Sequence, residues 1–468
     1  MKLAGPEQIR TDRRMITQTR RSNERKTKHR QMKSKILIII MTLGGTSLFG
    51  QEVLRKVDAI ELAMQSNFDI REAGNNKNIA VNNATKKNSG FLPSVSANGG
   101  ITYSITDSEN TFTSGDVQSA SGVQTERYNA SIGANYTLYN GESRKYNFKK
   151  FQESLNISEL QSRGVIENVI VNIFNSYYEV ARLTQNEITQ KETLDVSSER
   201  LRRAQYTFDY GQNTQLDVLN AEVDYNNDSI NYLNIVQLLH NEKRNLNLFL
   251  GREVNTPFSV DTEINYTQGL SREVLLEKAL INNVAVLQQN GFLRSAEYDI
   301  KINDGVNKPT VGLNTSYGWN QNNLGATSFV ESQNSSALSY GASVSWNIFD
   351  GGLTSVRRQN NRILLENQKL GIDRLRLNLN RDVNNAWSIY QTALFVLNAQ
   401  EKNLTTNERN FSRTREQQSL GQITSIEFRQ AQLNLLNAKL NYNQAKYSAK
   451  NAELALLQLS GELMDAEY

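Results

Sequence analysis

The sequence holds few of the residues that usually carry chemistry. It has no cysteine and only two histidines, His29 and His240. A thiolate metal centre is therefore excluded, and a histidine-based catalytic or metal site is nearly so. We find no Ser–His–Asp set, metal-ligand cluster or phosphate-binding loop, and paired carboxylates arise by chance on helices this polar. The sequence predicts a protein that is not an enzyme and that needs no cofactor and no metal.

Two acidic residues stand out because each follows the same glycine corner. The segment DYGQNTQLDV contains Gly211 and Asp217, and the segment SLGQITSIEF, 210 residues further on, contains Gly421 and Glu427. Each glycine separates two long polar patterns that we interpret as helices, and a threonine, a common N-cap residue, follows three positions later. The simplest interpretation makes both carboxylates first-turn acids, which the N-terminal dipole of a helix favours.

The amino terminus carries the positive charge of the chain. Residues 1–50 contain 12 Lys and Arg against 3 Asp and Glu, so the formal net charge of +4 becomes −5 for the remainder. Residues 32–50 have the layout of a secretory signal peptide, with lysines before a short apolar run that leads to small residues. We interpret residues 1–31 as a basic extension, either from a misassigned upstream start or as part of an extended leader. Since the basic charge is confined to the leader, no nucleic-acid partner is expected.

The chain reads as a duplication of one half-molecule. At an offset of 210 residues the corners, the segments around them and the ends of both halves match, and nearer the amino terminus the offset becomes 216. The period is far longer than that of a solenoid repeat. The sequence therefore predicts a first repeat over 53–251, a linker over 252–268, a second repeat over 269–461 and a tail over 462–468.

Each predicted repeat contains two segments in which apolar residues alternate with small or polar ones. The pattern predicts strands at about 94–106 and 127–139, and at about 310–320 and 337–349. In a soluble hairpin the apolar face would pack on a core, whereas in an outer-membrane barrel it would face lipid. The signal peptide favours lipid. Because even small barrels use about eight strands, four strands cannot close one, so either the chain is not a barrel or several chains share one. This deficit is the main argument in the sequence for an oligomer.

A very long helical pattern follows each strand pair. We expect helices at about 142–210 and 352–420, since neither range contains proline and each has one interior glycine. At 1.5 Å per residue each would span roughly 100 Å. Apolar residues recur within them at spacings of three and four, as coiled packing requires. A structural rod without a pore is the alternative interpretation of this pattern alone.

Together these features resemble the TolC-like outer-membrane factor family, over nearly all of residues 52–461. The resemblance rests on the order and duplication of the corners YGQNTQLDVLNAE and LGQITSIEFRQAQ and of the strand-to-helix segments LYNGES and IFDGGL. It implies an α+β membrane protein. Three chains, each giving four strands, would close a 12-stranded β-barrel in the outer membrane, above a periplasmic α-helical coiled-coil barrel.

The resemblance also implies a function and partners. Such proteins are passive exit ducts of tripartite efflux or type I secretion systems. This chain would then be a homotrimer in outer-membrane lipid that meets a periplasmic adaptor (membrane fusion) protein and an inner-membrane transporter. A non-channel periplasmic or surface coiled-coil protein, structural or adaptor, is the alternative function. The cargo, whether drug, metal ion or polypeptide, is not specified by the sequence.

The same resemblance assigns residues to the periplasmic tip. The positions implied for the tip and for adaptor docking are Tyr210, Gly211, Leu420 and Gly421. The positions implied for an entrance gate are Asp217, Glu427 and Gln430, although Gln430 stands where the family has an acid and Ile423 where it has a latching arginine. At a narrow entrance, three symmetry-related Glu427 carboxylates would favour cations and raise their own pKa values.

Overall fold

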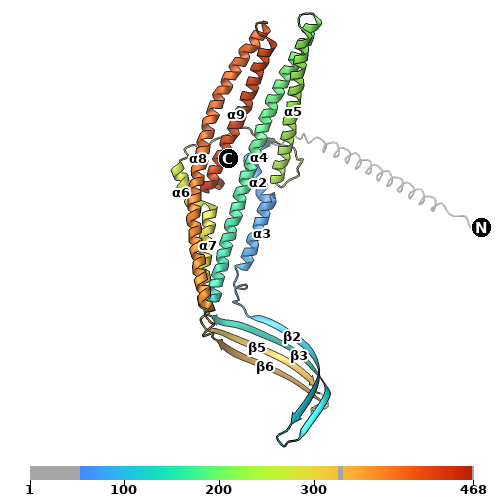
Figure 1. The fold of residues 1–468 in the computed structure, drawn as a ribbon, viewed down its shortest axis with the longest axis vertical. Coiled ribbons are helices and arrows are strands. Elements are labelled where there is room, and N and C mark those ends of the chain that lie inside the picture. Colours follow the sequence, from blue (N-terminus) through green and yellow to red (C-terminus); the bar gives the residue numbers. More distant parts are fainter. Residues whose placement is uncertain (1–52, 325–329, 466–468) are drawn as a thin grey trace, which may run out of the picture. The chain divides into compact units, whose positions relative to one another are not determined.

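The computed structural model describes residues 53–324 and 330–465. The predicted basic extension and signal peptide lie outside the described residues, as do residues 466–468 of the expected tail. The chain divides into two compact units, of which one holds residues 1–53 and 257–259. The other unit, residues 54–256 and 260–468, contains the long helices and the large sheet (Figure 1).

The elements follow one another in a similar order in the two halves of the chain. The first half contains β1 (Val53–Leu54), α2 (Lys56–Ser66), α3 (Phe68–Asn83), β2 (Ser94–Thr111), β3 (Val117–Asn140), α4 (Ser143–Asp209) and α5 (Gln215–Phe249). The second half contains β4 (Ser259–Val260), α6 (Arg272–Asn282), α7 (Val284–Gly305), β5 (Thr310–Asn323), β6 (Ser332–Ser345), α8 (Leu353–Ser419), α9 (Ser425–Ser460) and the 3₁₀ turn η1 (Leu463–Asp465). Helices α4 and α8 each contain 67 residues.

Four antiparallel strands form the large sheet in the order β2-β3-β5-β6, so that β2 and β6 are its edges (Figure 1). The register aligns the apolar positions of all four strands. Val95 pairs with Ala134, Ala134 with Thr315, and Thr315 with Tyr340. Because paired residues point to the same face of a sheet, one face is apolar from edge to edge.

All four strands differ from their predicted ranges at one boundary or more, and β6 begins at Ser332 rather than at 337. The segment between the first two predicted strands is mostly strand: β2 and β3 stay paired to Thr111 and Val117, past an irregularity after Thr106 where the Asp107 carboxylate accepts a hydrogen bond from the Gly122 amide (2.6 Å). In the fourth strand, the alternation continues to 349 but β6 ends at Ser345. Its partner β5 begins only at Thr310, after a proline, so the residues beyond 345 have no strand to pair with.

The apolar face of the sheet is not covered by the other described residues. The side chains of Val95, Ile101, Leu338 and Tyr340 are 66%, 76%, 68% and 85% exposed. A soluble hairpin would bury such residues on its own core, at about 1.5–3 kcal/mol for each large apolar side chain. The interpretation as a soluble, core-packed hairpin is therefore wrong for the single chain.

The helices bury their apolar residues against one another. In α4 the side chains of Phe174, Tyr177 and Tyr178 are almost fully buried, and the Tyr177 hydroxyl donates to Leu54 O (2.9 Å) and accepts from the Asp261 amide (3.0 Å). Burial raises the pKa of Tyr177 to about 12, so this hydroxyl stays protonated. Helices α6, α8 and α9 meet in a second cluster around Leu275, Tyr390 and Leu456. Within the described residues, no helix combines the length and apolarity that a membrane span requires.

A close approach of two glycines joins the sheet to the helices. Gly141, between β3 and α4, has φ +68°, and its backbone contacts Gly305 at the end of α7. A Cβ added to Gly305 would lie 2.7 Å from Gly141 O and 3.2 Å from Ser143 N. Both neighbours are backbone atoms that cannot rotate away.

We predict that Gly305→Ala lowers the free energy of unfolding by more than about 1 kcal/mol, because the backbone at the junction must shift. Gly74→Ala is the control, since Gly74 lies inside α3 and its added Cβ would meet nothing within 4 Å. The free energy of unfolding of that control should rise by up to about 1 kcal/mol, because alanine has a higher helix propensity than glycine. Thermal unfolding of the two purified variants would measure both; equal stability of Gly305→Ala and the unaltered chain would contradict the account.

Candidate functional site: the two glycine corners

The two glycine corners have the same backbone geometry. Helix α4 ends with its C-cap at Tyr210 and α8 with its C-cap at Leu420, and the glycines that follow have φ +71° and +72°. At the first corner the Gly211 amide donates to Phe208 O and the Gln212 amide to Thr207 O, both at 2.8 Å. The equivalent bonds at Gly421 are 3.0 and 2.9 Å long. Both are Schellman turns, which require a left-handed residue and hence favour glycine.

A capping box begins the returning helix at each corner. The Asp217 amide donates to Thr214 Oγ1 (3.3 Å), and the Asp217 carboxylate accepts from the Thr214 amide (3.1 Å). At the second corner the corresponding bonds between Thr424 and Glu427 are 3.2 and 2.8 Å long. Both acids thus satisfy backbone amides at helix N-termini, as their simplest interpretation predicted.

Capping changes the electrostatics expected for Glu427. In the single chain, the hydrogen bonds from the Thr424 amide and hydroxyl lower the pKa of this carboxyl, with partial desolvation opposing them. This direction is opposite to the increase expected for three carboxylates around one entrance. The side chain remains exposed, and only its Oε2 atom accepts the capping bonds. A charged oxygen therefore remains available at the surface of the corner.

Exposed apolar side chains flank both corners. Tyr210 is 81% exposed and Leu420 is 70% exposed. Leu216 and Ile426, in the first turns of α5 and α9, are 64% and 77% exposed. Figure 1 places each corner at the end of a helical hairpin away from the sheet. Each corner thus offers two apolar side chains beside a capped acid.

A buried polar cluster links the two hairpins close behind the corners. Arg429 of α9 makes two hydrogen bonds to the Asp228 carboxylate of α5, at 2.6 and 2.9 Å, and Asp228 also accepts from Ser197 of α4. Arg200 of α4 pairs with Asp224 of α5 at 2.6 Å. The Asp228 side chain is 1% exposed and that of Arg429 is 13% exposed. Burial lowers the pKa of Arg429, but the carboxylates of Asp228 and Asp224 raise it by more, so the net shift is upward. The guanidinium therefore stays charged beside its carboxylate partners.

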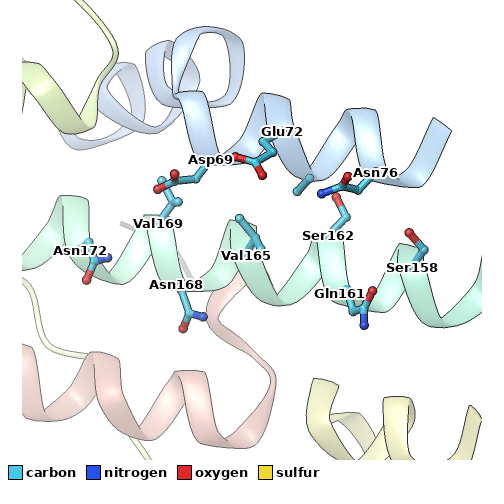
Figure 2. A pocket seen from close by; sticks show the side chains of 11 residues that line it. Asp69, Glu72, Asn76, Ser158, Gln161, Ser162, Val165, Asn168, Val169 and Asn172 are labelled. Atoms are coloured by element: carbon cyan, nitrogen blue, oxygen red, sulfur yellow. The ribbon is translucent and has the colours of Figure 1, made fainter. Parts of the chain in front are cut away.

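A polar hollow of about 390 Å³ between α3 and α4 has two acids in its lining (Figure 2). Asp69 and Glu72 of α3 line it opposite Ser158 and Ser162 of α4. Among the described residues neither carboxylate has a cationic partner within 4 Å, and no group of three His, Cys, Asp or Glu side chains is arranged to hold a metal ion. Two carboxylates on one helix do not suffice for a metal site.

The sequence of the chain matches a family model over both halves. The family described as outer membrane efflux protein matches residues 59–252 and 275–462. The chain belongs to this family. Membership places it in the outer membrane, with its helical part in the periplasm. The resemblance to TolC-like outer-membrane factors is thereby confirmed.

Individual relatives of this efflux-protein chain agree over most of their length. The outer membrane efflux protein BepC of Brucella suis is 21% identical over 445 residues, which cover 92% of this chain and 90% of BepC. The Campylobacter jejuni CmeC outer membrane channel superposes with a TM-score of 0.73 at 14% identity, over 87% of this chain and 86% of CmeC. The Vibrio cholerae outer membrane protein VceC superposes with a TM-score of 0.68 at 16% identity, over 87% of this chain and 96% of VceC. These structures share the fold, a mixture of long helices and a sheet.

The structure assigns local positions to all the residues predicted for the site. Tyr210, Gly211, Leu420 and Gly421 form the two turns, and Asp217 and Glu427 cap the helices that follow, each bonding within its own corner. Gln430 lies one turn further along α9, exposed, where its amide donates to Asn434 Oδ1 (2.9 Å). Ile423 is half-buried in the second turn. Their roles in docking and gating stay predictions.

Sequence reasoning missed the cluster around Arg429. Its members come from three helices, and Ser197 and Arg429 are 232 residues apart. One signal was available in the sequence. At the offset of 210, Arg429 corresponds to Leu219 and Asp228 to Ala438, so neither charge has a charged counterpart in the other half of the chain. A charged residue in one half of the chain whose counterpart in the other half is apolar indicates a contact that only one of the two halves makes.

We predict that Arg429→Met loosens the region behind the corners. It leaves the Asp228 carboxylate buried without its cation, a change that typically costs about 3–5 kcal/mol. The amides of 193–200 and 225–232 should then exchange hydrogen faster. The double variant Arg429→Met with Asp228→Leu should recover most of that protection, because it removes both charges.

Arg413→Met is the matched control, since Arg413 lies exposed on α8 and has no acidic partner within 4 Å in the described part of the chain. Its exchange should equal that of the unaltered protein. Unchanged protection in Arg429→Met would show that the cluster does not hold the hairpins together.

Proposed function

We propose that three copies of the chain form an outer-membrane exit duct. Four strands from each copy would close a 12-stranded barrel, and α4 and α8, at roughly 100 Å each, would extend it through the periplasm. The observation that carries the proposal is the open four-stranded sheet. Within residues 53–324 and 330–465, its two edges pair with no further strand and its apolar face is exposed. Four strands are too few to close alone, so the edges need strands from other copies.

A row of exposed apolar residues on α8 supports assembly with a second copy. Four apolar residues spaced seven apart lie on it: Val356, Ile363, Leu370 and Leu377, each 55–73% exposed. Helix α5 has a comparable exposed row made of Leu219, Val223, Ile230 and Leu233. A seven-residue apolar repeat is the pattern by which helices pack against one another. We infer that a neighbouring copy covers these rows.

The matched halves support a duplicated origin for the chain. The two family matches, 59–252 and 275–462, leave between them most of the predicted linker. Helices α4 and α8 are equal in length, and α5 and α9 contain 35 and 36 residues. With two corners in each copy, a trimer would bring six around one entrance.

We further infer that the corners meet the periplasmic adaptor. The exposed apolar residues at both corners, Tyr210, Leu216, Leu420 and Ile426, suit docking to apolar residues of a helical partner. The adaptor would couple the duct to an inner-membrane transporter, which supplies the energy. The duct itself would conduct passively, without a catalytic step, and its cargo would be chosen by the transporter.

Within the proposed duct, Glu427 is the candidate gate residue of the second corner. Its free oxygen would contribute to a ring of three negative charges, and such a ring favours cations. Asp217 would provide the equivalent ring at the first corner. Gln430 adds no charge, so the proposed gate has one acid at the second corner where the family pattern has two.

Ile363→Glu with Leu370→Glu should prevent trimer formation, because the neighbouring copy would have to bury two carboxylates. Mass determination of the purified protein in detergent would then give mainly single copies. Leu364→Glu is the control, since Leu364 is also exposed on α8 but lies about 100° around the helix from the row. A trimer that survives the double substitution would place the interface elsewhere.

Glu427→Gln should lower cation selectivity and change single-channel conductance in planar bilayers. Glutamine at this position can keep the capping box while it removes the charge. Thr424→Val is the matched control, because it removes the hydroxyl of the cap and keeps the carboxylate. Should Thr424→Val reproduce the effect, the change would stem from the cap; unaltered currents in Glu427→Gln would remove Glu427 from the gate.

A further inference from the structure

The junction of the sheet with the helices carries a cationic and aromatic cluster on the side of the apolar face. Arg144, in the first turn of α4, places its guanidinium 4.4 Å from the ring centre of Phe91 and 5.7 Å from that of Tyr136. It donates to Gly90 O (3.1 Å) and Leu138 O (3.3 Å). Arg144 thereby fixes the turn between α3 and β2 against the end of β3.

Three lysines around this junction have no acidic partner. Lys86 and Lys87 lie in the turn that Arg144 holds, where their carbonyls accept from the Phe91 and Gly90 amides. Lys149 lies one turn further into α4, with its ammonium 5.7 Å from the ring centre of Tyr146. All three are exposed, and among the described residues none has a carboxylate within 4 Å. By contrast, Lys145 and Lys150 pair with Glu142 and Asp299.

An apolar hollow on the sheet lies next to this cluster. It has a volume of about 480 Å³ and is lined by Pro93, Ala134, Tyr136, Leu313, Tyr340 and Ala342. The five strand residues point to the apolar face, because Tyr136 pairs with Leu313, Leu313 with Ala342, and Tyr340 with the partner of Ala134. Small residues between two tyrosines make the hollow, and Tyr136 is shared with the Arg144 stack.

We propose that this junction binds one anionic phospholipid of the outer membrane. The acyl chain would occupy the hollow between Tyr136 and Tyr340, and the phosphate would lie among Lys86, Lys87 and Lys149. Arg144 would act as a positioning residue, since its hydrogen bonds to backbone carbonyls hold the lysine turn. The occupant is a lipid because the chain resides in the outer membrane and the hollow lies on the bare apolar face.

A lipid complements both parts of this junction. Its acyl chain suits the apolar hollow, and its phosphate suits exposed lysines that have no carboxylate within 4 Å among the described residues. Lysines and tyrosines together at the end of an apolar surface are typical of membrane interfaces, where phosphate groups lie. The inference rests on the proposed function in one respect, namely that the apolar face of the sheet meets lipid.

The test uses the full-length trimer purified in a neutral detergent and native mass spectrometry. Phosphatidylglycerol and phosphatidylcholine with the same acyl chains are titrated separately. We expect phosphatidylglycerol to bind more tightly. Lys86→Gln with Lys87→Gln and Lys149→Gln should weaken its binding at least about tenfold, since each lysine near an anionic surface contributes a factor of about five. Phosphatidylcholine binding should stay the same in that variant.

Two further variants separate the parts of the site. Ala342→Phe fills the hollow and should weaken both lipids alike. The control, Lys402→Gln with Arg409→Gln and Arg413→Gln, removes the same charge from exposed positions of α8 and should bind both lipids normally.

The possible outcomes each decide one question. Equal phosphatidylglycerol binding by the lysine variant and the unaltered protein would overturn the proposal. Complete displacement of the lipid by excess inorganic phosphate would also overturn it, because the junction would then be a phosphate site. A single copy in the unaltered protein before any lipid is added would instead contradict the proposed trimer.

Discussion

Backbone hydrogen bonding at the edges of the sheet is the constraint on which the rest of the structure depends. In the described part of the chain, the outer edges of β2 and β6 pair with no further strand, and in hydrocarbon every unpaired amide or carbonyl costs several kcal/mol. Water would satisfy the edges but not the apolar face, whose side chains are exposed in the single chain. In the proposed duct, closure with further copies would satisfy both requirements. The long helices would then have to follow the strands from which they continue, and the tight contact of Gly141 with Gly305 lies at that transition.

The two corners share a backbone and differ in what holds them. Both have a Schellman turn and a capping box, so the turn itself is built twice from the same local parts. Behind the second corner, however, Arg429 reaches across to Asp228 of the first hairpin, and the corresponding pair in the repeat, Leu219 and Ala438, carries no charge. The ion pair is one of several contacts between the hairpins, which also include the Lys439–Glu192 pair and a hydrogen bond from Gln432 to Thr193 O. Local sequence sets the shape of each corner, whereas contacts that α9 makes with α4 and α5 set the relation of the two hairpins.

Local signals explain how much of the molecule the sequence could predict. Some features depend only on neighbours a few residues away, and the sequence predicted them. They are the corners at Gly211 and Gly421, the threonine caps, and the alternation along β2 and β3. The end of β6 at Ser345 was not predicted, because it depends on where β5 begins opposite it. The Arg429 cluster was out of reach for a similar reason, since its geometry exists only when α4, α5 and α9 are packed. The lining of the hollow between Tyr136 and Tyr340 likewise follows from strand register rather than from either strand alone.

The seven-residue spacing from Val356 to Leu377 has a consequence for the path of α8. A straight helix has 3.6 residues per turn, so a row of residues seven apart drifts by about 20° for each repeat. Over the three intervals of this row the drift reaches roughly 60°. The row can face one partner throughout only if the two helices wind around each other with a left-handed twist. In the proposed duct the helices would then form a left-handed supercoil rather than run parallel to the duct axis. Because each helix would be tilted to that axis, the duct would be shorter than the helix itself.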